Sequence, residues 1–217
     1  MTAPFPDAGG ILDALDDAPV IAVVVIDDAA DAVPLANALA SGGVRAIEVT
    51  LRTPAALDAI ERIVGNVEGM KVAAGTVTRP EDVARVSELG VDFAVSPGFT
   101  ATLAAAAARA GLPLLPGVAT PSETMLGREH GVRTFKFFPA ESLGGAKMLA
   151  AWGELFPDVR FCPSGGIDPG NAAGYLELPN VPAVGGSWLA PRELIRDRGW
   201  QQIEQRAAAA ARRVTAA

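Results

Sequence analysis

A lysine stands among three phenylalanines in residues 134–140, which read TFKFFPA. The run is short, apolar and bounded by glycine and proline, a pattern that predicts a buried strand. Side chains alternate along a strand, so Lys136 points to the face opposite Phe135 and Phe137. A buried ammonium is unfavourable unless it is paired, and burial lowers the pKa of a lysine. Lys136 is therefore a candidate nucleophile for Schiff-base chemistry.

The chain contains only two other lysines, Lys71 and Lys147. Lys71 opens a predicted strand and Lys147 lies in a predicted helix, and we expect both to be solvated. Lys136 alone has surroundings suited to covalent catalysis. The alternative is a lysine at the end of the sheet that extends to water or pairs with a carboxylate. The strand pattern by itself leaves both interpretations open.

A second predicted strand, residues 46–51, carries charge on one face. Glu48, Thr50 and Arg52 follow the alternation on that face, while the other face is apolar and should meet the helices. Buried charges need partners. The pair could be a structural ion pair. It could also be a proton-transfer carboxylate beside a guanidinium that binds a substrate carboxylate through two hydrogen bonds.

Other polar or tight segments follow the next predicted strands. Thr76 shares a face with Val72 and Ala74, so its hydroxyl could point inward and contact a ligand. Thr78 is expected instead to cap the helix that begins at Pro80. Pro97 lies in a tight loop after the fourth strand, where backbone could approach a ligand closely.

Two glycine pairs, each beside a serine, follow the last two predicted strands. Glycines expose backbone N–H groups, and a helix N-terminus favours an anion. In closed barrels the loops after the last two strands commonly bind phosphate. A single pair is usually just a turn, but two pairs at these positions indicate a phosphate site. The residues concerned are Ser164, Gly165, Gly166, Gly185, Gly186 and Ser187.

Eight short strands alternate with helices along the chain, after a short helix at residues 9–17. Thr53 and Thr120 each precede a proline and are expected to cap helices. The alternation predicts a single (β/α)8 barrel over residues 1–217. An open doubly wound sheet is the alternative, but its glycine-rich dinucleotide fingerprint is absent. The predicted strands cover residues 20–26, 46–51, 70–74, 92–95, 112–115, 134–137, 159–162 and 181–184.

Composition limits the classes of function. The 217 residues are 50% hydrophobic, which fits one domain with a substantial core, and the net charge of -7 argues against a nucleic-acid or membrane-surface partner. Cys162 is the single cysteine and His130 the single histidine, which disfavours disulfides and metal sites rich in these residues. Neither a secretory signal nor a membrane-spanning run is recognisable, so we expect a cytoplasmic protein. The arginines near the C-terminus are assigned to a solvated helix face.

Five motifs together resemble a known family, the bacterial 2-keto-3-deoxy-6-phosphogluconate (KDPG) and 4-hydroxy-2-oxoglutarate (KHG) aldolases. The resemblance runs from about residue 20 to residue 189, with the motifs in the order of the family. It implies a class I aldolase, a lyase of carbohydrate metabolism in the Entner-Doudoroff pathway, on a (β/α)8 barrel that is trimeric and needs no metal. The motifs are GVRAIEVTLR (43–52), AGTV (74–77), FKFFPAE (135–141), FCPSGGI (161–167) and GGSWL (185–189).

The resemblance also implies roles for individual residues. Lys136 would form the Schiff base with the keto acid and Glu48 would move protons. Arg52 and Thr76 would hold the carboxylate of the pyruvyl half. Gly165, Gly166 and Ser187 would bind the phosphate, and Ser164 stands where well-known members carry threonine, a change that could alter aldehyde preference.

The expected reaction is cleavage of the phosphorylated keto acid to pyruvate and glyceraldehyde 3-phosphate, and of 4-hydroxy-2-oxoglutarate to pyruvate and glyoxylate. The galactonate epimer shares the same pyruvyl half and stays an alternative substrate. A phosphosugar isomerase, a thiamine-phosphate-type synthase and a non-catalytic sugar-acid-binding barrel are the other readings. Metal-binding carboxylates would be needed for the synthase, and only Asp168 is well placed.

Overall fold

The computed structural model describes residues 5–15 and 18–214. Its strands are short, mostly buried and parallel to their neighbours. Apolar residues on both faces suit strands that are covered by helices on one side and by a shared interior on the other. The strands are β1 (Val20–Val24), β2 (Ala46–Thr50), β3 (Lys71–Gly75), β4 (Phe93–Val95), β5 (Leu114–Leu115), β6 (Gly117–Val118), β7 (Thr134–Phe137), β8 (Arg160–Pro163) and β9 (Val184–Gly186).

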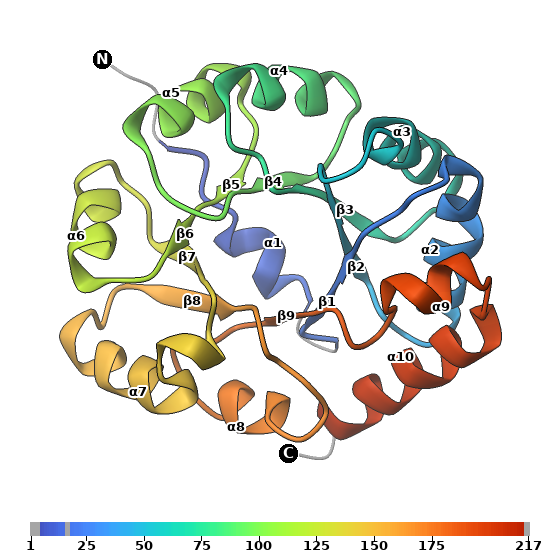
Figure 1. Cartoon of the computed structure of the whole chain (residues 1–217). Helices are drawn as coiled ribbons and strands as arrows, with labels where there is room; N and C mark the ends of the chain where they lie inside the picture. Colours follow the sequence, from blue (N-terminus) through green and yellow to red (C-terminus); the bar gives the residue numbers. More distant parts are fainter. Residues whose placement is uncertain (1–4, 16–17, 215–217) are drawn as a thin grey trace.

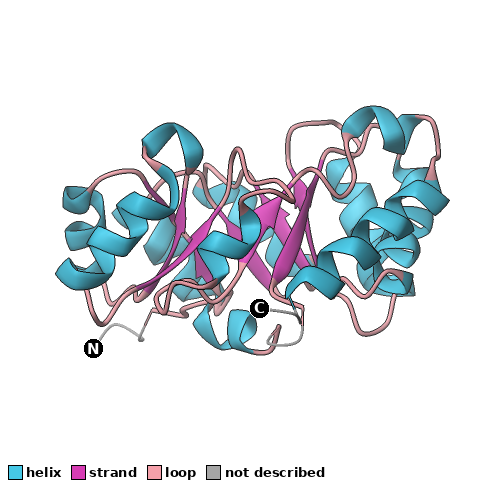
Figure 2. Ribbon diagram, turned by 90° about the horizontal axis from the view of Figure 1, so that it is seen from below, coloured by secondary structure: helices cyan, strands magenta, loops and turns pink. Residues whose placement is uncertain are grey.

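The strands gather around the centre of the molecule, with most helices outside them (Figures 1 and 2). No described helix is both long and apolar enough to cross a membrane. The α-helices are α1 (Gly9–Asp13), α2 (Ala32–Ser41), α3 (Ala56–Asn66), α4 (Pro80–Glu88), α5 (Ala101–Ala110), α6 (Pro121–Glu129), α7 (Gly145–Leu155), α8 (Ala172–Leu176), α9 (Arg192–Arg196) and α10 (Trp200–Val214), and the 3-10 helices are η1 (Ala29–Asp31) and η2 (Glu141–Leu143).

Hydrogen bonds divide the strands into two parallel sheets. One has the order β5-β4-β3-β2-β1-β9 and the other the order β6-β7-β8. Pro116 separates β5 from β6 and has no N–H to donate, so the ladder changes sheet there. On the other side, a parallel bridge between Ser164 and Gly185 connects β8 to β9. The predicted α/β arrangement of parallel strands is confirmed, while a continuous hydrogen-bonded ring of eight strands is not shown.

Buried apolar side chains form two clusters that follow the alternation along the strands. Ala22 on β1 belongs to the larger cluster, which packs against the outer helices, whereas its neighbour Ile21 belongs to the smaller, interior cluster. Leu12 and Leu15 from the α1 region complete the interior cluster. Burial of a leucine side chain contributes roughly 1.5–3 kcal/mol to the free energy of folding. Figure 1 shows that α1 lies across the middle of the molecule. This helix therefore fills the interior at one end of the strands.

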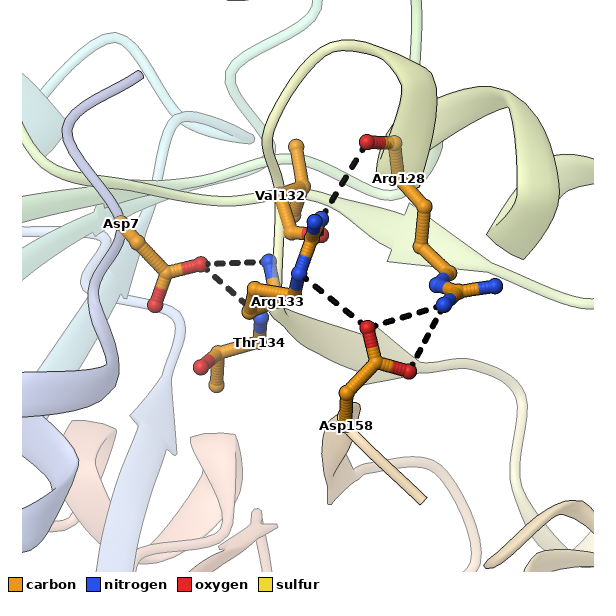
Figure 3. A network of polar contacts seen from close by, with 6 residues as sticks. All are labelled: Asp7, Arg128, Val132, Arg133, Thr134 and Asp158. Atoms are coloured by element: carbon orange, nitrogen blue, oxygen red, sulfur yellow. Dashed lines mark hydrogen bonds and ion pairs between the residues drawn. The ribbon is translucent and has the colours of Figure 1, made fainter. Parts of the chain in front are cut away.

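Asp7 connects the N-terminal segment to strands of both sheets. Its backbone forms a parallel bridge with Leu114 on β5. Its carboxylate accepts the backbone N–H groups of Arg133 and Thr134, each at 2.9 Å (Figure 3). On the other side of Arg133, Asp158 pairs with the Arg133 guanidinium at 3.3 Å. The start of β7, the strand that carries Lys136, is thus held from two sides.

We expect Asp7→Ala to lower the free energy of unfolding by about 1.5–3 kcal/mol, because the backbone N–H groups of Gly9, Arg133 and Thr134 lose a charged acceptor. Urea denaturation would measure the change. Asp58→Ala, at an exposed position in the first turn of α3, is the control and should cost less than about 1 kcal/mol, the value of its interaction with the helix dipole. Equal effects of the two substitutions would contradict this role for Asp7.

Several local predictions differ from the structure. Thr120 caps α6 as expected, but α3 begins at Ala56 and the Thr53 hydroxyl donates to the carbonyl of Ile26 at 2.5 Å. Thr78 was expected to cap α4, but Arg79 occupies the cap position and no side chain caps it. The short N-terminal helix begins at Gly9 as predicted and ends at Asp13, and residues 16–17 of the prediction lie outside the described residues.

Candidate active site

Lys136 and Glu48 form a buried ion pair across the interior. The lysine Nζ lies 3.1 Å from Glu48 Oε1 and 3.3 Å from Oε2. The two residues are only 7% and 3% exposed. Lys136 comes from β7 and Glu48 from β2, and both side chains point away from the outer helices, as the alternation predicted. Nζ also lies 5.3 Å from the centre of the Phe138 ring. The structure therefore brings together the predicted nucleophile and the predicted proton carrier.

The strand neighbours of Lys136 offer no competing reactive nucleophile. Lys136 pairs in register with Gly117 on β6 and Cys162 on β8. The pKa of the Cys162 thiol is raised to about 12, mainly by burial; the Lys136 charge lowers it and the Glu48 carboxylate raises it by smaller amounts. The thiol is therefore protonated near neutral pH and stays inert. Cys162 belongs to the interior cluster.

Gly75, at the end of β3, makes room for the Glu48 carboxylate. A Cβ atom at this position would lie 2.3 Å from Glu48 Oε1 and 2.6 Å from its Cγ. Glu48 also pairs in register with Ala73, the other small residue on that face of β3. The small residues Ala73 and Gly75 thus leave space for the Glu48 carboxylate to approach Lys136.

We expect Gly75→Ala to reduce kcat by about tenfold to a hundredfold, because the added methyl group must displace the carboxylate from the amine. The overpacking should also lower the free energy of unfolding by about 1–3 kcal/mol. Steady-state kinetics and thermal unfolding would measure both effects. Gly65→Ala is the matched control, because a Cβ there meets no atom within 4 Å. An unchanged kcat in Gly75→Ala would contradict the packing argument.

Arg52 is oriented by Thr50. The Thr50 hydroxyl donates to the carbonyl of Val24 at 2.9 Å and accepts from Arg52 Nε at 3.1 Å. Because its proton is committed to Val24, the hydroxyl offers Arg52 a lone pair, and the guanidinium keeps its Nη groups for a ligand. Those two groups can bind one carboxylate together.

Thr76 and Pro97 lie near the same ends of the strands. Thr76 has a left-handed backbone with φ of 60°, a conformation that is strained for a threonine and concentrates at functional sites. It lines a cavity of about 330 Å³ with Thr53 and Arg79. The carbonyl of Pro97 packs against Gly117, since a Cβ on Gly117 would lie 2.2 Å from that oxygen. Pro97 thereby contacts the strand beside Lys136.

The two glycine pairs have different structures. Gly165 and Gly166 form a turn with φ values of 93° and 81°, which glycine adopts without strain. Gly185 and Gly186 were expected in a loop, but they lie within β9. The ring of Trp188 covers Gly186 so closely that an added Cβ would lie 1.5 Å from a ring carbon. Gly185 and Gly186 are therefore part of the sheet. Of the two pairs, only Gly165 and Gly166 have the geometry of an exposed turn.

One cavity joins several of the predicted binding residues. Its volume is about 560 Å³, and its lining includes Arg52, Gly166 and Ser187. These residues follow β2, β8 and β9, so the cavity lies at the carboxyl ends of the strands, where parallel α/β proteins place their sites. Lys136 and Glu48 do not line this cavity and are less than 10% exposed. The Arg52 guanidinium and the Gly166 turn in the lining suit a small anionic molecule.

A model of the KDPG and KHG aldolase family matches residues 11–206. The chain belongs to this family. The KHG/KDPG aldolase of Escherichia coli (strain K12) is 48% identical over 189 residues, which cover 87% of this chain and 89% of that relative.

Two solved structures of the family are also similar. One is the KDPG aldolase from Legionella pneumophila with pyruvate captured at low pH as a covalent carbinolamine intermediate. Its TM-score is 0.88 and its identity 45%, with 91% of this chain and 97% of that chain covered. The other is the 2-keto-3-deoxy-6-phosphogluconate aldolase of Zymomonas mobilis ZM4 with 3-phosphoglycerate, with a TM-score of 0.86 and 44% identity over 95% of this chain and 96% of that chain.

Sequence reasoning missed some residues at the site of this KDPG and KHG aldolase family member. Arg192 lines the 560 Å³ cavity, although the C-terminal arginines were assigned to a solvated helix face. Trp188 lines it too. The position of Arg192, one turn after the last glycine motif, was the available signal. Among the described residues, no group of three or more His, Cys, Asp or Glu side chains could hold a metal ion.

Proposed function

We propose that this protein is a class I aldolase that cleaves 2-keto-3-deoxy-6-phosphogluconate to pyruvate and glyceraldehyde 3-phosphate through an imine on Lys136. The observation that carries the proposal is the buried Lys136 amine, 3.1 Å from the Glu48 carboxylate. Membership of the KDPG and KHG aldolase family supports the same reaction. The family match also sets aside the synthase and isomerase readings.

The reaction begins when the Lys136 ammonium gives a proton to Glu48 and the resulting neutral amine attacks the C2 keto carbon; Glu48 returns the proton to the hydroxyl that leaves as water. The carbinolamine loses water and becomes an iminium ion, which serves as the electron sink, so the bond cleavage requires no metal. Glu48 takes the proton of the C4 hydroxyl, the C3–C4 bond breaks, and its electrons form an enamine. The aldehyde leaves. Protonation at C3 and hydrolysis then release pyruvate and restore the amine.

The carboxylate end and the distal end of the substrate bind to different groups of residues. Arg52, directed by Thr50, binds the carboxylate of the pyruvyl half, and Thr76 contributes its hydroxyl. The distal half lies along the turn of Gly165 and Gly166, whose backbone N–H groups favour a phosphate. The rest of the surface that contacts the distal half is formed by Pro97, Ser164, Gly185, Gly186 and Ser187.

Borohydride trapping tests the proposal directly. Incubation with pyruvate and sodium borohydride should add one reduced pyruvyl group to the chain, because the hydride fixes the imine as a stable amine. Peptide mapping should place the adduct on Lys136, with Lys71 and Lys147 unmodified. Absence of an adduct in protein that stays folded would refute the Schiff-base mechanism.

Cleavage of 4-hydroxy-2-oxoglutarate to pyruvate and glyoxylate is a second activity that the family description favours. Both substrates present the same pyruvyl half to Lys136 and Arg52, and only the aldehyde half differs. Pyruvate release from the two acids, and from the galactonate epimer of the first, would rank the three substrates.

The architecture and setting follow from the same proposal. We propose that the two sheets form one eight-stranded (β/α)8 barrel, which the single-residue gap at Pro116 between β5 and β6 and the Ser164–Gly185 bridge between β8 and β9 support. The resemblance further implies a cytoplasmic homotrimer of the Entner-Doudoroff pathway. Light scattering coupled to size-exclusion chromatography would test the trimer.

A further inference from the structure

The proposed substrate carries negative charge at both ends, whereas the protein has a net charge of -7. Attraction of such an anion must therefore come from cations placed locally at the site. The ionised side chains that line the 560 Å³ cavity are Arg52, Arg192 and Asp168. Arg52 is assigned to the carboxylate of the pyruvyl half. Without Arg192 the remaining lining would have no net charge.

Asp168 is the acidic residue of this lining, and one of its carboxylate oxygens accepts hydrogen bonds from backbone N–H groups. Asp168 Oδ1 accepts the N–H of Gly170 at 2.6 Å and the N–H of Asn171 at 3.1 Å. This oxygen is thus engaged by its own turn. Arg192 is left as the second cation, beside Arg52, of the cavity that Gly166 and Ser187 also line.

Asp27 holds Arg192 in a defined orientation. Arg192 Nε and Nη2 donate to the two Asp27 oxygens at 2.9 and 2.5 Å. Arg196 Nε donates to the same carboxylate at 2.7 Å. These contacts hold the pKa of Asp27 well below its usual range, and the contact with Arg192 has the larger effect. One carboxylate thus faces two guanidinium groups, and the group of three keeps a charge of plus one.

The orientation leaves part of Arg192 for a ligand. Asp27 occupies the edge formed by Nε and Nη2, and Nη1 has no hydrogen-bond partner among the described residues. Arg196 shares the carboxylate but does not line the cavity. The two arginines therefore both contact Asp27, but only Arg192 lines the cavity.

We propose that Arg192 is a specificity-determining residue that binds the anionic group at the aldehyde end of the substrate and so selects phosphorylated over unphosphorylated 2-keto-3-deoxy acids. This assignment rests on the proposed aldolase function. It adds a charged side chain to a phosphate site that otherwise consists of backbone N–H groups and serine hydroxyls.

The test compares Arg192→Gln with the matched control Arg196→Gln. Cleavage of 2-keto-3-deoxygluconate and of its 6-phosphate is measured for each variant and for the unaltered protein. Arg192→Gln should lower kcat/KM for the phosphorylated acid by about tenfold to a hundredfold, the usual effect of losing one charge-assisted hydrogen bond, and mainly through KM. The unphosphorylated acid should change by less than about twofold, and Arg196→Gln should change neither substrate by more than that.

Three results would overturn the assignment: equal losses on the two substrates, equal losses in the two variants, or an unchanged KM for the phosphorylated acid in Arg192→Gln. Arg192→Lys should recover part of the preference, because it restores the charge without the two-pronged contact to Asp27. The proposed function fails separately, if the unaltered protein cleaves neither acid and forms no adduct with pyruvate.

Discussion

Lys136→Arg is expected to abolish aldol cleavage, with a loss of at least about ten-thousand-fold in kcat. A guanidinium keeps the positive charge beside Glu48 but does not form the imine. Pyruvate release from 2-keto-3-deoxy-6-phosphogluconate would measure turnover, and borohydride trapping would measure the imine. Both signals should vanish together, since every later step proceeds from the same adduct.

The control for this experiment is Lys147→Arg, the same change at an exposed position of α7. It should leave turnover and trapping intact. Because Lys136 is buried and arginine is larger, thermal unfolding is measured for both variants, and Lys136→Met provides a second inactive variant of similar size. Cleavage by either folded Lys136 variant would show that another group carries the chemistry.

Glu48→Gln is the second large effect and should lower kcat by about a hundredfold to ten-thousandfold, the range for loss of a positioned general base. Glutamine has nearly the same shape, so the interior stays filled. Its amide does not take the proton of the C4 hydroxyl, and C3–C4 cleavage stalls even where the imine forms. Rapid-quench measurement of pyruvate release would show the loss, with Lys136 still available for trapping.

Glu154→Gln makes the same chemical change at an exposed position of α7 and serves as the control. Removal of the Glu48 charge also leaves the Lys136 amine without its carboxylate partner, so the unfolding midpoint is recorded for each variant. A turnover within about threefold of the unaltered protein would exclude Glu48 as the proton carrier.

The sequence alone determined the features that depend on local pattern. The strand that carries Lys136 was predicted at residues 134–137 and has those bounds, because glycine and proline delimit a short apolar run. The alternation along the strands at 46–51 and 134–137 placed Glu48 on the face away from the helices and Lys136 on the face opposite Phe135 and Phe137, without knowledge of their partners. The five motifs and their order identified the family, and the parallel α/β arrangement followed from the repeated strand–helix pattern.

Tertiary structure decided the features that depend on residues far apart in the chain. Lys136 and Glu48 are 88 positions apart, and only the packing of β7 opposite β2 brings them to 3.1 Å. The space that Gly75 leaves for the carboxylate and the contact of Asp7 with β7 are likewise invisible to a local pattern.

Arg192 shows the same limit at the rim of the site. Helical periodicity shows which arginines of a helix face solvent. It does not show that the solvent-facing side chain of Arg192 lines a cavity. Gly185 and Gly186 read as a loop because glycine is common in turns, yet the β1 ladder and the Trp188 ring keep them in a strand. Local pattern thus specified which groups the protein has, and long-range packing specified which of them meet.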